Sequence, residues 1–327
     1  MIGLVGCGRA EALGDEPREP DPSPPVPTGE ATVAPEAAAR EDSVLEGQAA
    51  DTRAPASVET SAGWFAEATL ENAAFETPGA PSVVVHAPPD FDATEPLDLV
   101  VFVHGWRGCA RQLAQAGEVS CSSRGRPLPG WDLAGRFDEA QVNALFIVPQ
   151  LAFLRRSGSA GAFTQEGRFA AFLEEMLGAI RDRIGPPSTL ARVRSITILA
   201  HSAGYETTLA LLSRGGVANK IRSIVLFDAL YRGHLRFADW VAEPATPERR
   251  LISLHGRQGR TVSQSLMLAA RLRDGLGDEL SVHAEGSLST LIQSHRVVVA
   301  HAGVPHGDVP AHHMAEVLRA LLPGAPP

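Results

Sequence analysis

The segment SITILAHSAG, residues 195–204, decides the fold of this 327-residue chain. Its first part is rich in aliphatic and β-branched side chains, as in strands that are covered on both faces of a sheet. A helical pattern over Ala203–Ser213 follows at once. Ser202 is therefore expected in a tight turn between a buried strand and a helix, flanked by the small residues Ala200 and Gly204.

Short apolar runs alternate with helical patterns from residue 62 onward. This alternation predicts an α/β domain over residues 62–327, with a mostly parallel central sheet of about seven or eight strands flanked by helices. The expected strands are residues 83–86, 97–103, 144–148, 195–200, 221–227, 250–254 and 296–300. The expected helices are residues 163–184, 203–213, 261–273 and 309–322, each ending near glycine or proline.

Three further segments place polar residues directly after these strands. LVVFVHGW, residues 99–106, is a strand followed by His104, Gly105 and Trp106. The strand at residues 221–227 ends in Asp228, and AGVPHGDVP, residues 302–310, places His306 between the last strand and the last helix.

These segments resemble the α/β-hydrolase superfamily, whose serine lies in a strand–turn–helix elbow written G-x-S-x-G. The resemblance covers about residues 80–322, and Ala200 replaces the first glycine. It implies an acyl-transfer enzyme with Ser202 as nucleophile, His306 as base and Asp228 as the acid that orients the base. The oxyanion would be held by the backbone amides of Trp106 and Ala203.

The acid is the least determined member of this triad. In the superfamily it most often follows the strand that is here residues 250–254, but His255-Gly256 follows instead. Some members use the earlier strand, which favours Asp228, with Asp239 and Asp308 as rivals. The alternative interpretation of Ser202 itself is an N-cap of the following helix.

His301 is the main rival for the base, and His312 and His313 are expected to be exposed. The histidines near the C-terminus could suggest a metal site, but no spacing resembles H-E-x-x-H or another standard ligand set. No metal and no cofactor is therefore predicted. The remaining histidines have no motif around them.

The pocket is expected to be lightly covered. Residues 229–249 are too short for a large helical cap domain, so the cover would come from the cysteine-containing loop and Gln150–Gly167. Tyr231, Phe237 and Trp240 are predicted to line an acyl or leaving-group pocket, although aromatics at such spacing more often pack in a core.

The N-terminus carries Leu-Val-Gly-Cys7, which resembles the lipobox of bacterial lipoproteins. The stretch before it lacks the basic residues and apolar run of a signal peptide, so either the true start lies upstream or the match is chance. We expect a lipobox-like segment at residues 1–7 with Cys7 lipidated, and an extracytoplasmic location. In such a compartment Cys109 and Cys121 are expected to form a disulfide.

Charge separates the chain into two parts. Residues 8–60 hold twelve acids and four arginines, contain no Phe, Trp or Tyr, and predict a disordered acidic tether over residues 8–61. The remainder has 25 basic and 26 acidic side chains, which gives no basic stripe for nucleic acid. The membrane is expected as a partner only through the lipid anchor.

The sequence therefore predicts a serine hydrolase that cleaves a carboxylic ester, or an amide, through an acyl-enzyme on Ser202. The substrate would be a small or envelope-derived molecule. Two alternatives stay open: a cell-envelope peptidase or amidase, and a non-catalytic binding protein on the same fold.

Overall fold

The computed structural model of the protein describes residues 63–322. Cys7 and the tether predicted over residues 8–61 lie outside the described residues. The domain boundary at residue 62 and the lipid anchor accordingly remain predictions.

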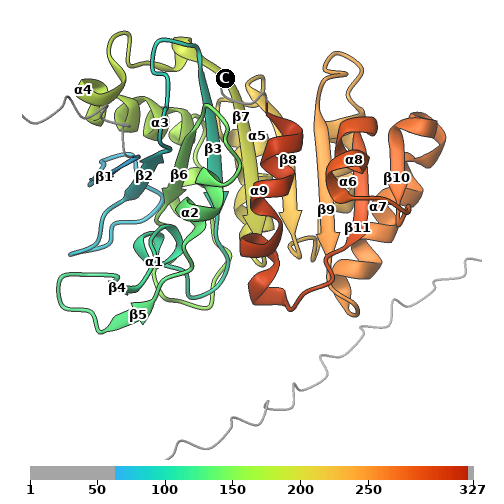
Figure 1. Cartoon of the computed structure of the whole chain (residues 1–327), viewed down its shortest axis with the longest axis horizontal. Coiled ribbons are helices and arrows are strands. Elements are labelled where there is room, and N and C mark those ends of the chain that lie inside the picture. Colours follow the sequence, from blue (N-terminus) through green and yellow to red (C-terminus); the bar gives the residue numbers. More distant parts are fainter. Residues whose placement is uncertain (1–62, 323–327) are drawn as a thin grey trace, which may run out of the picture. The chain divides into compact units, whose positions relative to one another are not determined.

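A nine-stranded sheet forms the centre of the described region, in the order β1-β2-β6-β3-β7-β8-β9-β11-β10 (Figure 1). β2 pairs antiparallel with both β1 and β6, whereas every other neighbouring pair is parallel. The carboxyl ends of the parallel strands therefore meet at one edge. The strands are β1 (Trp64–Ala68), β2 (Val83–Ala87), β3 (Leu97–Val103), β6 (Leu145–Pro149), β7 (Val193–His201), β8 (Ile221–Phe227), β9 (Arg250–His255), β10 (Leu280–Val282) and β11 (Val297–His301).

Helices cover both faces of the sheet, as predicted for an α/β fold. One apolar core contains side chains of α3, α5, α6 and α7, and the other contains side chains of α1, α2, α8 and α9. The helices are α1 (Ala110–Ala114), α2 (Leu133–Asp138), α3 (Arg168–Ala179), α4 (Arg181–Ile184), α5 (Gly204–Arg214), α6 (His234–Ala242), α7 (Arg260–Leu276), α8 (Leu288–Ser294) and α9 (Val309–Leu321). Short 3₁₀ turns lie at Gly161–Thr164, Leu190–Arg192, Gly277–Glu279 and His306–Asp308.

The central strands are buried on both faces because their side chains alternate between the two cores. In β3, Val101 and Val103 face the first core, while Val100 and Phe102 face the second. All seven residues of β3 are buried. This two-residue period explains why β3 reads as a continuous apolar run and not as a polar–apolar alternation.

All seven predicted strands are present, and the sheet adds β1 and β10. β1 alternates between exposed and half-buried residues, and β10 has three residues, so neither gives an apolar run. The helix predicted over residues 163–184 is wrong as a single element. It is divided into a 3₁₀ turn, α3 and α4. Gly167, in the left-handed region at φ 70°, separates the turn from α3, and Ile180, whose φ of -105° and ψ of 13° are not helical, separates α3 from α4.

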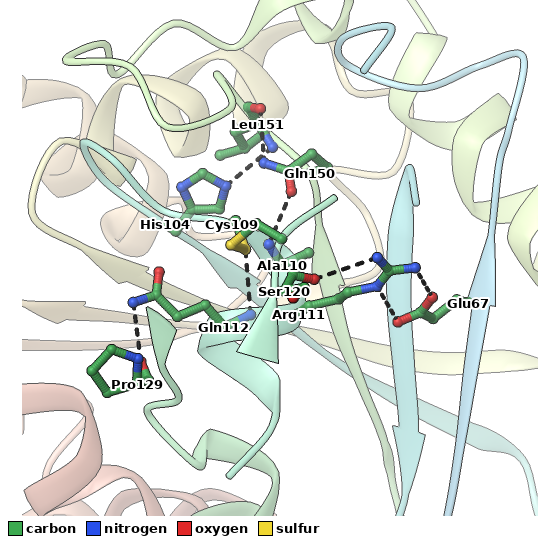
Figure 2. Close-up of a disulfide and its surroundings, with 11 residues drawn as sticks. Glu67, His104, Cys109, Ala110, Arg111, Gln112, Ser120, Pro129, Gln150 and Leu151 are labelled. Carbon is green, nitrogen blue, oxygen red and sulfur yellow. Dashed lines mark hydrogen bonds and ion pairs between the residues drawn. A yellow bond between two sulfur atoms is a disulfide. The ribbon is translucent and has the colours of Figure 1, made fainter. Parts of the chain in front are cut away.

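A small hairpin extends from the sheet after β3. It contains α1 and the paired strands β4 (Glu118–Ser120) and β5 (Pro127–Pro129). The predicted disulfide between Cys109 and Cys121 is present, with the two Cα atoms 5.9 Å apart. Cys109 also caps α1 by accepting a hydrogen bond from the amide of Gln112 at its Sγ atom (Figure 2).

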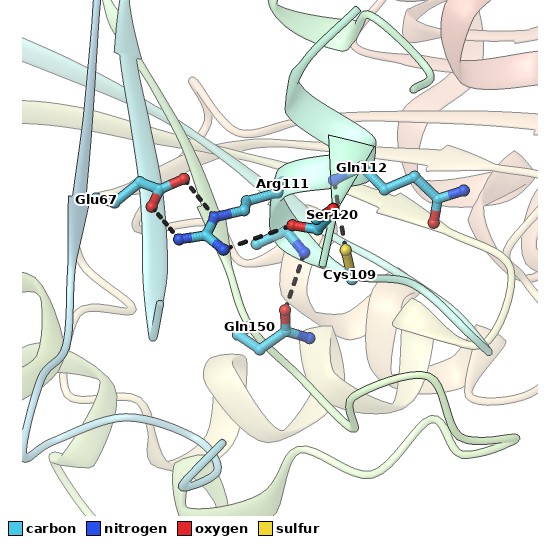
Figure 3. A network of polar contacts seen from close by, with 7 residues as sticks. Glu67, Cys109, Arg111, Gln112, Ser120 and Gln150 are labelled. Atoms are coloured by element: carbon cyan, nitrogen blue, oxygen red, sulfur yellow. Dashed lines mark hydrogen bonds and ion pairs between the residues drawn. The ribbon is translucent and has the colours of Figure 1, made fainter. Parts of the chain in front are cut away.

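Polar contacts join this hairpin to the sheet. Arg111 of α1 donates from two guanidinium nitrogens to the two carboxylate oxygens of Glu67 in β1, at 2.7 and 2.5 Å (Figure 3). A third contact runs from Arg111 to the carbonyl of Ser120 at 3.5 Å. The Gln150 side chain, at the end of β6, accepts from the Ala110 amide at 2.9 Å. The start of α1 is thus held by contacts to β1 and to the residue that follows β6.

Removing the disulfide is expected to destabilise the domain. The two cysteines are separated by 12 positions, and closing a loop of this length in the unfolded chain corresponds to about 3 kcal/mol. The double variant Cys109→Ser, Cys121→Ser should lose about that much free energy of unfolding in a urea titration. A reducing agent should lower the stability of the wild type and leave the double variant unchanged; an equal effect on both would contradict the prediction.

Candidate active site

Ser202 occupies the turn between β7 and α5, as predicted. Its φ of 55° lies in the left-handed region, which is uncommon for a residue with a side chain and is typical of strained functional turns. The Ser202 amide donates to the carbonyl of Phe227 at 3.3 Å, so the turn remains joined to the neighbouring strand β8. Ser202 is half-buried and therefore accessible at the carboxyl edge of the sheet.

Two glycines let the backbone pass unusually close to this turn. A Cβ atom on Gly204 would lie 2.2 Å from the carbonyl oxygen of Val103, and one on Gly105 would lie 2.7 Å from Cβ of Ser202. The same Cβ on Gly105 would lie 3.0 Å from the Ala203 amide nitrogen. The loop after β3 therefore lies directly beside the Ser202 turn, and no residue larger than glycine fits at either position.

His306 and Asp228 are brought together from the loops that follow β11 and β8. The Asp228 Oδ2 atom lies 2.7 Å from Nδ1 of His306, although the residues are 78 positions apart. Asp228 follows β8 directly, and His306 opens the 3₁₀ turn before α9. Because Nδ1 faces the carboxylate, Nε2 is the nitrogen left to exchange a proton with another group.

The Asp228 carboxylate is held by three donors. Besides His306, its Oδ1 atom accepts from the Gly256 amide at 2.9 Å and from the Thr261 hydroxyl at 2.5 Å. Burial raises the pKa of Asp228, but the hydrogen bonds from His306, Thr261 and Gly256 outweigh burial and hold the pKa at about 2. The group is therefore a carboxylate throughout the physiological pH range. The sequence analysis did not identify Thr261 or Gly256 as supports of the acid.

His201, the residue before the serine, contacts the loop that carries His306. Its ring lies 4.7 Å from the His306 ring, centroid to centroid. Burial and the nearby His306 lower the pKa of His201 to about 3, so the ring is neutral. Its Nε2 lies 3.0 Å from the carbonyl oxygen of His306 and, protonated, donates to it. Nothing in the sequence pattern pointed to this contact, which joins residues 105 positions apart.

Tyr231 lies beside both Ser202 and His306. Burial and the Asp228 carboxylate raise the pKa of the Tyr231 phenol, whereas a hydrogen bond with the Ser202 side chain lowers it. The Tyr231 ring is 6.5 Å from the His306 ring and 6.0 Å from the Tyr205 ring. The expectation that Tyr231 lines the site agrees with these contacts.

Phe237 and Trp240, predicted to line the same pocket, do not. Both side chains are buried in the core that contains α6, and Trp240 is covered by the Arg249 guanidinium at 5.1 Å from its ring centroid. α6 is amphipathic and packs its apolar face on the neighbouring helix and sheet, so these aromatics contribute to packing. The prediction for them was wrong.

Both ring nitrogens of His104 form hydrogen bonds with the backbone. Its Nε2 accepts from the Leu151 amide at 3.1 Å (Figure 2). Nδ1 therefore carries the proton and donates to the Gly105 carbonyl at 2.9 Å. Burial lowers the pKa of His104 to about 4, consistent with a neutral ring. His104 thus fixes the loop that carries Trp106 against the segment after β6.

The rival residues lie in other contacts. Asp239 is exposed and pairs with Arg271 at 3.5 Å, and Asp308 is exposed. His301 is exposed and accepts from the Gly303 amide at Nδ1, 3.1 Å away. His312 is exposed as expected, but His313 is half-buried, with Nε2 2.7 Å from the Ala302 carbonyl.

Neither metal ligands nor a membrane-spanning helix emerge from the described part of the chain. Across residues 63–322, no three or more histidine, cysteine, aspartate or glutamate side chains are grouped so that they could hold a metal ion. Over the same residues, no helix has the length and apolar character needed to cross a membrane.

Comparisons with known proteins identify the fold. No protein-family model and no curated protein matches the chain. A mutant of the feruloyl esterase module from Clostridium thermocellum, solved with sinapinate, is 12% identical, with a TM-score of 0.51 over 79% of this chain and 88% of that chain. EstE1, a thermophilic carboxylesterase cloned from a metagenomic library, is 12% identical, with a TM-score of 0.42 over 80% and 87%. The chain has the α/β-hydrolase fold that its sequence motifs implied.

The Asp228 interactions make a stability prediction. Its folded pKa of about 2 is below its unfolded value of 3.8, so the stabilisation is complete above pH 4 and is lost as pH falls towards 2. We expect Asp228→Asn to be less stable than the wild type at pH 7 by about 2 kcal/mol, with the difference shrinking between pH 4 and 2. Urea titrations at pH 7, 4 and 2.5 measure it, and a difference that is constant with pH would contradict the assignment.

Proposed function

We propose that the protein is a serine hydrolase that cleaves a carboxylic ester through an acyl-enzyme on Ser202. The observation that carries the proposal is the pairing of His306 with Asp228 at 2.7 Å, together with a serine held in a left-handed turn at the same edge of the sheet. His201 and Tyr231 connect this pair to the Ser202 turn through the contacts described above. A helix N-cap alone would require neither the pair nor the strained turn.

The reaction proceeds in two balanced halves. His306 Nε2 takes the Ser202 proton while Oγ bonds to the ester carbonyl carbon, and the C–O bond to the alcohol then breaks as the alcohol receives that proton. A water molecule next attacks the acyl carbon and gives its proton to His306. The bond to Oγ breaks, the carboxylic acid leaves, and Ser202 regains its proton.

The negative oxygen formed in each half is assigned to the amides of Ala203 and Trp106. Support comes from the close approach of Gly105 to both Ser202 and Ala203, which brings the two amide-bearing turns side by side. Two amides aimed at a developing oxyanion contribute several kcal/mol to catalysis in serine hydrolases. Asp228 keeps His306 in the tautomer that leaves Nε2 unprotonated before the reaction.

An ester is the substrate class to test first, because the feruloyl esterase module that shares the fold is named for ester cleavage. The compartment is part of the same proposal. The Cys109–Cys121 disulfide supports an oxidising, extracytoplasmic location, with an anchor through Cys7.

The anchor makes a separate prediction. In native full-length protein, mass spectrometry of the mature N-terminus should find a lipidated Cys7. A free, unlipidated Met1 would contradict it and would leave the hydrolase assignment untouched.

The hydrolase assignment is tested with a fluorophosphonate probe and p-nitrophenyl esters of increasing chain length, with a p-nitroanilide as the amide control. The wild type should be labelled once and should turn over the esters. Ser202→Ala should lose labelling and at least about 10⁴-fold of turnover, since the serine acts as a unit with its base. Ser213→Ala, which removes an exposed serine of the same helix α5, is the matched control and should behave as the wild type.

Other results would contradict the hydrolase assignment or its ester specificity. No labelling of the folded wild type, or labelling that persists in Ser202→Ala, would reject the enzyme. Faster turnover of the anilide than of every ester would reject ester specificity and favour an amidase.

A further inference from the structure

Four loops around Ser202 concentrate positive charge. The loops after β3, β6, β8 and β9 span residues 104–108, 150–160, 228–233 and 256–260. They contain six arginines: Arg107, Arg155, Arg156, Arg232, Arg257 and Arg260. The only acid in these loops is Asp228, which is buried and already bonded to three donors. All six arginines are exposed. We refer to them as the arginine rim.

The rim lies at the catalytic edge and not elsewhere on the surface. The Arg107 amide donates to the Arg155 carbonyl at 2.8 Å, so the first two loops are in contact. A Cβ on Gly158, in the second loop, would lie 2.9 Å from Cβ of Ala203. Four of the six arginines also adjoin residues of the site in sequence. Arg107 follows Trp106, Arg232 follows Tyr231, Arg257 follows Gly256, and Arg260 precedes Thr261.

The rim arginines form no ion pairs with the carboxylates of the described residues. Within residues 63–322, none of the six guanidinium groups contacts a carboxylate within ion-pair distance. Two of them act on the site from a distance. Burial and Glu206 raise the pKa of the Tyr205 phenol, while Arg232 and Arg260 lower it. The positive field of Arg232 and Arg260 therefore reaches Tyr205, whose ring lies 6.0 Å from the Tyr231 ring.

This charge is segregated from the rest of the domain. The globular part has 25 basic and 26 acidic side chains in total. Taking away the six rim arginines and Asp228 leaves 19 basic against 25 acidic groups over the remainder. The nearest exposed acids at the same edge are Glu206 and Asp308. Keeping like charges together without partners costs electrostatic free energy, which a ligand of opposite charge would recover.

Two exposed apolar side chains lie in the same loops. Trp106 is 58% exposed and Leu154 is 41% exposed, both unusual for large apolar residues. The Leu154 amide donates to the Gly108 carbonyl at 3.4 Å, which places the two loops side by side. The entrance to Ser202 therefore offers an apolar contact surface together with unpaired guanidinium groups.

We propose that the substrate is an anionic ester, in which a carboxylate, phosphate or sulfate group on the acyl or alcohol part is bound by the arginine rim. This inference rests on the proposed function and specifies its substrate class. Guanidinium groups suit this role because their paired N–H donors match the oxygens of such anions. Trp106 and Leu154 would contact the apolar part of the same molecule.

The experiment compares matched esters that differ in charge. On the alcohol side the pair is 4-acetoxybenzoate and 4-acetoxybenzamide; on the acyl side it is the mono-4-nitrophenyl ester of adipate and 4-nitrophenyl hexanoate. At about 10 mM ionic strength, kcat/KM should be at least about tenfold higher for the anion of one pair. That advantage should shrink severalfold at about 0.3 M salt, because exposed charges are screened.

The variants use two positions on one helix. Arg260 and Arg273 lie on α7 and are both exposed, but 13 residues separate them, which is about 20 Å along the axis. Arg260→Gln should lower the anionic-to-neutral ratio of kcat/KM about threefold at low salt, and adding Arg232→Gln should lower it further. Arg273→Gln removes the same charge at the far end and should leave that ratio unchanged.

A binding measurement separates this inference from the catalytic proposal. Ser202→Ala protein should bind 4-acetoxybenzoate or adipate more tightly than the matched neutral compound in calorimetry. If esters are cleaved through Ser202 but neither anion is preferred in turnover or binding, the inference is wrong and the hydrolase stands. If anions bind preferentially but no ester is cleaved, the rim is an anion site and the proposed function fails. An equal loss in Arg273→Gln would also overturn the inference.

Discussion

The structure of the site depends on the contact between the end of β3 and the Ser202 turn. A Cβ on Gly204 would lie 2.2 Å from the Val103 carbonyl oxygen, so strand and helix can approach only without that atom. Gly105 makes the corresponding approach from the loop after β3. This steric constraint places the loop after β3 beside the amide of Ala203. Ala200 is tolerated where the superfamily has a glycine, because its side chain lies in the buried core on one face of β7.

The position of the acid on β8 has consequences for the neighbouring strand. Isolated carboxylates are costly to bury, so Asp228 needs donors as well as His306. They come from the end of β9, where Gly256 supplies an amide, and from the first turn of α7, where Thr261 supplies a hydroxyl. The end of β9, where the resemblance to α/β-hydrolases first led us to expect an acid, therefore supplies donors to Asp228 instead. A side chain on Gly256 would come within 3.3 Å of the carboxylate, which also favours glycine at that position.

The sequence predicted those features that are local. Ser202 and Asp228 directly follow buried strands, and His306 follows the last strand. Parallel strands end at one edge, so the approach of Asp228 and His306 follows from topology. The sequence did not predict β10, the division of α3 from α4, or the burial of Phe237 and Trp240. These depend on edge pairing, on the non-helical backbone at Ile180 and on which face α6 buries. The support of His306 by His201 was also missed, because it joins residues 105 positions apart with no shared motif.

The net charge of the domain gave the least information about the site. The domain is nearly neutral in total, although the arginines of the rim gather at one edge of it. The rim arginines and the two oxyanion amides act over different ranges. Exposed guanidinium groups are screened beyond about 8–10 Å in physiological salt, so their main influence is on the capture and orientation of a charged substrate. The amides of Ala203 and Trp106, in the oxyanion role proposed for them, would act at contact distance, where salt does not intervene. Ionic strength should therefore alter kcat/KM for anionic esters far more than kcat. The arginines that attract the substrate are not the groups that stabilise the negative oxygen of the transition state.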